Sequence, residues 1–92
     1  MDAASAKQQY KAVLSPNPNQ GSFTLLFPYD IHVERFYFYD PSGRKYVLDK
    51  NSWRKNGELV EFELPVEYSG LYYIQGVSDQ GVLPSLPVMI QK

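Results

Sequence analysis

The chain of 92 residues contains no cysteine, which excludes disulfide bonds, thiolate metal ligands and cysteine nucleophiles together. It also lacks any run of about 18 apolar residues, so we expect no membrane-spanning helix. An excess of one charge is missing too, because nine Lys and Arg against ten Asp and Glu give a net charge of −1. A phosphate-binding surface is therefore not expected, and nucleic acid is a poor candidate for a partner.

Residues suited to catalysis are scarce. His32 is the single histidine, and neither a nucleophile nor a metal-ligand spacing accompanies it. Glu61 and Glu63 could suggest paired acids, but they alternate with Val60 and Phe62, which predicts a solvent-facing position. No glycine-rich segment has the strand–loop–helix context of a phosphate loop. We therefore predict that the chain is not an enzyme and needs no cofactor or metal.

Aromatic residues, by contrast, are abundant. They make up 15% of the chain, with eight Tyr and five Phe, and aromatic rings suit half-buried pleated surfaces. Seven Pro and six Gly are spread along the sequence, as expected of turns between short elements. The length fits a single domain with a modest core. The composition thus favours one small all-β domain.

About seven short segments alternate between apolar and polar residues and end at turn signals, which predicts a β-sandwich or small barrel. These segments are 10–14, 22–27, 33–40, 44–49, 58–64, 71–78 and 82–91. Pro84 and Pro87 give the last segment the character of an edge strand. The side chains predicted to face the core are Phe23, Leu25, Phe27, Phe36, Phe38, Tyr46, Leu48, Val60, Phe62, Leu64, Tyr72, Ile74, Val88 and Ile90.

The connecting segments carry their own signals. Residues 15–21 hold two prolines and two asparagines, which exclude both a helix and a central strand. Residues 40–43, Asp-Pro-Ser-Gly, have the composition of a β-turn, and the pair at 56–57, Asn-Gly, indicates a hairpin. Residues 50–57 are expected to form a polar connection that holds the one tryptophan, Trp53.

Two groups of aromatic residues have alternative interpretations. Trp53 lies among basic residues, so it could stack on a base or a sugar, although a tryptophan that caps one end of a sandwich is the favoured reading. Tyr37, Tyr39 and Tyr73 either cover the second face of a sheet or form an exposed recognition patch. The sequence leaves the second choice open.

Four motifs occur in a fixed order along the chain. Residues 16–23 read PNPNQGSF, residues 39–44 read YDPSGR, and Leu64-Pro65 is followed by SGLY at 69–72. A final strand then runs almost to the last residue. Together these motifs resemble the type A C-terminal sorting domains of the bacterial type IX (Por) secretion system, over about residues 14–92, nearly all of the expected folded part.

The resemblance implies an Ig-like β-sandwich of about seven antiparallel strands at 10–92, preceded by a flexible linker at 1–9. It implies a signal that directs an N-terminal cargo through an outer-membrane translocon with the help of shuttle proteins. A sortase-like peptidase then usually removes the domain and attaches the cargo to the cell surface. The parent protein would pass through the periplasm to the outer-membrane surface or the medium. Because residues 1–9 contain no apolar stretch, its export leader is expected on the cargo.

The resemblance also supplies candidate residues for translocon recognition, taken from the motifs and the last strand. For residues 40–44 a stable hairpin is favoured over direct recognition. The alternative function is a retained carbohydrate-binding or adhesive module of a cell-surface protein or of the secretion machinery, with Trp53 and the outward tyrosines as its platform. The twelve recognition candidates are Pro16, Asn17, Pro18, Gly21, Asp40, Gly43, Arg44, Gly70, Tyr72, Val88, Ile90 and Lys92.

Overall fold

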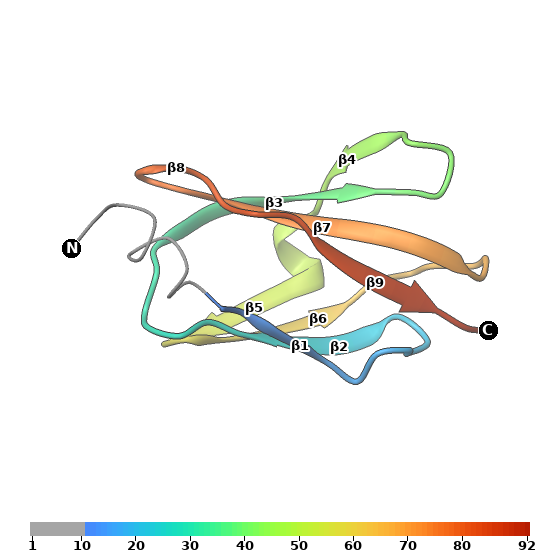
Figure 1. Ribbon diagram of the computed structural model, residues 1–92, viewed down its shortest axis with the longest axis horizontal. Coiled ribbons are helices and arrows are strands. Elements are labelled where there is room, and N and C mark those ends of the chain that lie inside the picture. The colour runs from blue at the N-terminus through green and yellow to red at the C-terminus, as the bar shows by residue number, and fades with distance from the viewer. Residues whose placement is uncertain (1–10) are drawn as a thin grey trace.

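A computed structural model describes residues 11–92, which form two antiparallel β-sheets packed face to face (Figure 1). Within this part of the chain no helix is long and apolar enough to cross a membrane. The β-sandwich expected from the strand and turn pattern is confirmed. The linker expected at 1–9 and the first residue of the expected first strand lie outside the described residues.

The first sheet has four strands and the second has five. The first has the order β1-β2-β6-β5, with β1 at Val13–Ser15, β2 at Ser22–Leu26, β6 at Leu59–Glu63 and β5 at Trp53–Asn56. The second has the order β4-β3-β7-β8, with β4 at Lys45–Val47, β3 at Val33–Tyr39, β7 at Gly70–Ser78 and β8 at Gly81–Val82. The last strand, β9 at Leu86–Ile90, also pairs with β7, and one 3₁₀ turn, η1 at Lys50–Ser52, leads into β5.

The core between the sheets is built from alternate residues of the strands, as the period of two in the sequence predicts. Phe36 of β3 is fully buried at its centre, with ring centroids 4.9 Å from both Phe62 and Trp53 in edge-to-face contact. Phe38 stacks on Tyr72 at 5.0 Å. All but two of the predicted core residues are buried. The exceptions are Leu48, which is half-buried against the core, and Tyr46.

The prediction that Tyr46 points inward is right about the face of the sheet, but Tyr46 is not part of the core. Tyr46 pairs with the buried Phe38, so its side chain lies on the inner face of the sheet, yet it is 42% exposed. The reason is that β4 extends beyond the area that the first sheet covers, and Figure 1 shows it rising away from the sandwich. Alternation predicts which face a residue occupies but not whether anything covers that face.

The sequence also underestimated the number of strands, which is nine rather than seven in the described residues. The expected polar connection at 50–57 contains β5, which pairs with β6. Only Trp53 gives this strand an apolar inward residue, so no alternation is visible. Its second inward position is Lys55, whose ammonium lies 2.6 Å from both Asp30 Oδ1 and the carbonyl oxygen of Gly57. The predicted hairpin is present, with Gly57 at a φ of 64° in the turn.

Candidate functional site

The candidate recognition residues come from distant parts of the sequence but gather at one end of the sandwich. At this end lie the loop 16–21, the β3–β4 turn 40–43, the β6–β7 connection 64–69 and the last residues, 90–92 (Figure 1). We call this end the motif end. The described chain enters β1 at the opposite end (Figure 1).

The loop 16–21 is attached to the last strand through its backbone. The N–H of Asn19 donates to the carbonyl oxygen of Met89 at 2.9 Å, and the N–H of Gln91 donates to the carbonyl oxygen of Asn19 at 2.8 Å. These bonds form a parallel bridge between Asn19 and Ile90, which joins the first sheet's loop to the second sheet. The loop therefore fastens the two sheets together at the motif end.

The asparagine side chains complete this attachment. Asn17 accepts a hydrogen bond from the N–H of Met89 at 2.8 Å and donates one to the carbonyl oxygen of Pro87 at 3.2 Å. Asn19 is only 7% exposed, and its amide donates to the carbonyl oxygen of Pro16 at 2.9 Å and accepts from the N–H of Gly21 at 2.8 Å. The side chain of Asn17 thus binds the strand, whereas that of Asn19 holds the loop in shape.

One consequence is that the outer edge of β9 is occupied. The groups on this edge that point away from β7 are the carbonyl oxygens of Pro87 and Met89 and the N–H groups of Met89 and Gln91. Asn17 and Asn19 provide a partner for every one of them. Although β9 is the edge strand that the prolines predicted, it offers no unpaired backbone groups here for another strand.

The glycine of the first motif lies against the third. The carbonyl oxygen of Gly21 accepts a hydrogen bond from the N–H of Leu64 at 2.9 Å. The φ of Gly21 is 119°, and a Cβ at this position would lie 2.7 Å from the carbonyl oxygen of Leu64. Backbone approach this close, together with a positive φ, requires glycine.

The β3–β4 turn is held by one carboxylate oxygen. Asp40 Oδ1 accepts from the N–H of Ser42 at 3.0 Å, from its hydroxyl at 2.7 Å and from the N–H of Arg44 at 2.9 Å. These bonds, the Ser42 hydroxyl foremost, lower the pKa of Asp40 below its ordinary value. The N–H of Gly43 closes the turn on the carbonyl oxygen of Asp40 at 2.9 Å. This geometry fits the predicted stable hairpin, in which Asp40 acts on its own turn.

Arg44 is left without an ion pair among the described residues, because its backbone rather than its guanidinium meets Asp40. The guanidinium donates to the hydroxyl of Tyr46 at 3.3 Å, and the side chain is exposed. It is therefore available to a partner.

The second and third motifs also meet. A Cβ on Gly70, whose φ is 155°, would lie 2.7 Å from Cγ of Pro41, so the ring of the turn proline rests on the glycine backbone. Two residues on, the hydroxyl of Tyr72 donates to the carbonyl oxygen of Tyr68 at 2.8 Å. Burial raises the pKa of Tyr72 above its ordinary value. This arrangement ties the β6–β7 connection to the β3–β4 turn.

Burial divides the twelve candidates into two groups with different roles. Only exposed residues can touch a partner, whereas buried ones can act only through the fold. The exposed group is Pro16, Asn17, Pro18, Gly43, Arg44 and Lys92; Asp40 and Gly70 are half-buried; Gly21, Tyr72, Val88 and Ile90 are buried. The candidates chosen from the sequence omit three residues that make contacts at the motif end: Asn19, Pro41 and Met89. For Asn19 the regular spacing of asparagines at 17 and 19 was a visible signal.

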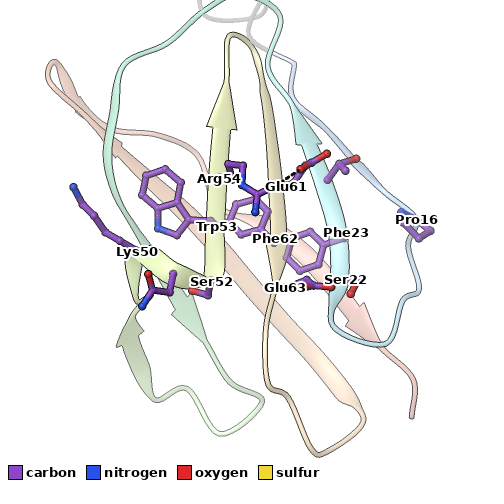
Figure 2. A pocket seen from close by; sticks show the side chains of 12 residues that line it. Pro16, Ser22, Phe23, Lys50, Ser52, Trp53, Arg54, Glu61, Phe62 and Glu63 are labelled. Carbon is purple, nitrogen blue, oxygen red and sulfur yellow. Dashed lines mark ion pairs between the residues drawn. The ribbon is translucent and has the colours of Figure 1, made fainter.

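The described residues do not form the other candidate sites considered from the sequence, namely the Trp53 platform, the paired acids and a metal site. Trp53 is half-buried in edge contact with Phe36, so it is not an exposed stacking platform, and its indole nitrogen has no hydrogen-bond partner among residues 11–92. Figure 2 shows Trp53 and Arg54 on either side of β5. The guanidinium of Arg54 lies 3.7 Å from the carboxylate of Glu61, and these residues help to line an open depression of about 740 Å³. Glu61 is exposed, as its alternation predicted. Residues 11–92 contain no cluster of three or more potential metal ligands.

No protein-family model matches this sequence, and no curated protein is significantly similar to it.

Proposed function

We propose that the chain is a C-terminal sorting domain of the type IX secretion system, a folded signal that carries an N-terminal cargo across the outer membrane. The observation that supports this proposal most is the gathering of all four motifs at the motif end. A protein that served only as a spacer would have no need for exposed motif residues from several segments at one end of the sandwich.

The contacts between the motifs also support recognition of the domain by its partner as a folded surface. Hydrogen bonds link the loop at 16–21 to β9, and the N–H of Lys92 donates to the hydroxyl of Ser69 at 2.8 Å. The exposed motif residues are therefore held in one geometry before any partner arrives, which lowers the entropic cost of recognition. The chain enters β1 at the other end, where a preceding cargo would leave the motif end clear (Figure 1).

The test is a secretion assay. A periplasm-targeted fluorescent reporter is fused ahead of residues 1–92 and expressed in a Gram-negative bacterium that has the type IX system and in a strain without its translocon. We expect fluorescence at the surface or in the medium only in the intact strain. Fluorescence retained in the periplasm of both strains, with the domain folded, would show that this chain is not a sorting signal.

A pair of arginine variants separates recognition from stability. Arg44→Ala removes an exposed cation at the motif end, whereas Arg54→Ala removes an exposed cation on the first sheet. Export should fall several-fold for Arg44→Ala and stay unchanged for Arg54→Ala, with both proteins equally stable. Equal export by both variants would remove Arg44 from the recognition surface.

A retained glycan-binding module is the second candidate, and one observation favours it. Tyr39 and Tyr73 are direct cross-strand partners on the outer face of the second sheet. With Leu71 and Gln75 they line an open groove of about 550 Å³. If the chain is such a module, the NMR resonances of both tyrosine rings should shift when soluble oligosaccharides are added. Unchanged spectra across a panel of neutral and acidic glycans would rule it out.

A further inference from the structure

Strand β4 is exposed on both faces. Its three residues, Lys45–Val47, are all exposed, and Val47 is 62% exposed. One long side is paired with β3, and no strand of residues 11–92 lies on the other. The opposite sheet does not cover it, because β4 rises away from the sandwich (Figure 1).

The hydrogen-bond pattern shows which backbone groups are free. The N–H of Leu48 donates to Phe36 and the N–H of Asp40 donates to Arg44, at 2.9 and 3.0 Å respectively. Hydrogen-bonded and non-bonded residue pairs alternate along an antiparallel ladder. The pair Phe38–Tyr46 lies midway between the two pairs just named, so it is hydrogen-bonded as well. The N–H and C=O groups of Lys45 and Val47 therefore point away from β3. Within residues 11–92 they have no partner.

The contrast with β9 is informative. Both strands lie at the margin of the second sheet, but the outward groups of β9 all bind the loop at 16–21. An unpaired strand edge is a template for another chain, and proteins usually block it. This chain closes the outer edge of β9 with two asparagines and leaves the outer edge of β4 open.

The side chains at β4 indicate the chemistry of a partner. Arg44 and Lys45 form no ion pair with any other described residue, and the ammonium of Lys45 lies 3.9 Å from the ring centroid of Tyr37. The nearest acids in sequence, Asp40 and Asp49, accept hydrogen bonds from the backbone of their own turns, and Asp40 reaches Arg44 only through the Tyr46 hydroxyl between them. A partner strand would thus meet two unpaired cations beside exposed apolar surface on Tyr46 and Val47.

We propose that β4 is a strand-addition site, which binds an extended segment of a partner protein that alternates apolar and acidic residues. The partner's backbone pairs with the outward groups of Lys45 and Val47, as in other peptide complexes of this kind. Because successive side chains of a strand face opposite sides, its carboxylates meet Lys45 while its apolar side chains cover Tyr46, or they meet Arg44 while its apolar side chains cover Val47. This inference goes beyond the sorting function and does not depend on it.

The test is a titration of ¹⁵N-labelled protein, residues 1–92, with a designed peptide that alternates valine and glutamate. We expect the largest shift changes at the amides of Lys45 and Val47, with hydrogen exchange at both slowed at least tenfold at saturation. A peptide with lysine in place of each glutamate should bind several-fold more weakly. Equal binding of the two peptides would overturn the proposal that the partner segment is acidic.

Variants at the outward positions test the backbone contact itself. Val47→Pro removes an N–H that β3 does not use, and proline is tolerated on the open side of an edge strand. Val47→Ala removes side-chain atoms but keeps the N–H. Binding should be lost with proline and fall less than threefold with alanine. If proline at this position disturbs the fold, Lys45→Pro is compared with Lys45→Ala, which removes the same ammonium but keeps the N–H at the other outward residue.

Two outcomes would overturn the proposal. Unchanged affinity of folded Val47→Pro or Lys45→Pro would show that the backbone edge is not the binding element. Concentration-dependent shifts of the same amides without peptide, together with a dimer in sedimentation, would show that a second copy of this chain occupies the edge instead.

Discussion

The backbone N–H of Asn19 donates a 2.9 Å hydrogen bond to the carbonyl oxygen of Met89, which joins the first loop of the described chain to its last strand. The two segments belong to different sheets, so this contact closes the sandwich at the motif end. It also occupies the edge of β9. The asparagines of the first motif thus have a structural task that is independent of any partner.

Replacement of Asn19 should therefore destabilise the fold more than replacement of Asn17. The Asn19 side chain is buried with two hydrogen bonds, and Asn19→Ala leaves the Gly21 N–H without its partner. We expect a loss of about 2 kcal/mol in the free energy of unfolding, measured by urea denaturation. Asn17→Ala, at an exposed site, should cost about 1 kcal/mol or less. The reverse order would contradict this assignment.

The contact between Pro41 and Gly70 predicts a coupled pair of substitutions. Gly70→Ala forces a Cβ to 2.7 Å from the proline ring at a φ of 155°. It should destabilise the domain by about 1–3 kcal/mol. Adding Pro41→Ala removes the clash but not the backbone strain, so the double variant should recover part of the loss. A double-mutant cycle in thermal or urea unfolding measures the coupling, and strict additivity would mean that the two residues do not interact.

Two glycines of the recognition list should behave differently although both have positive φ. Gly21→Ala places a Cβ 2.7 Å from a backbone oxygen that cannot rotate away, whereas Gly43→Ala meets nothing within 4 Å. We expect about 3 kcal/mol for Gly21→Ala, from strain and clash together, and about 1 kcal/mol for Gly43→Ala. Chemical denaturation of both variants under one condition gives the comparison. Equal losses would show that crowding at Leu64 is unimportant.

The turn carboxylate predicts a dependence of stability on pH. Because hydrogen bonds lower the pKa of Asp40 in the folded state, the unfolded chain binds a proton more readily as the pH falls. The stabilising contribution is complete above the unfolded pKa, near 3.8, and is lost as the pH drops through the folded value. Asp40→Asn should flatten the stability profile below about pH 4. Parallel profiles for the two proteins would contradict this linkage.

Much of the fold was predictable from the sequence because it follows local rules. The alternation of Val60, Phe62 and Leu64 with glutamates defines a buried and an exposed face, and the structure confirms both. The turn at 40–43 was equally predictable, since the Asp40 carboxylate accepts a hydrogen bond from the turn backbone and the N–H of Gly43 closes the turn. Such signals depend only on neighbours within a few positions.

The two failures have different causes. Strand β5 pairs with β6 across the predicted turn at 56–57, but it shows no alternation because its second inward side chain is Lys55, which forms an ion pair with Asp30. The exposure of Tyr46 depends on how far the opposite sheet extends, which the residues around Tyr46 do not determine.

The sequence by itself determined the strand periods, the turn positions and the order of the motifs, because each is a property of adjacent residues. Only the tertiary structure decided which edge is closed and which is open. Asn17 and Asn19 could have faced solvent, but the packing of the two sheets brings them to the outward groups of β9. The same packing leaves the outward groups of Lys45 and Val47 unpaired, since no segment of the described chain reaches them.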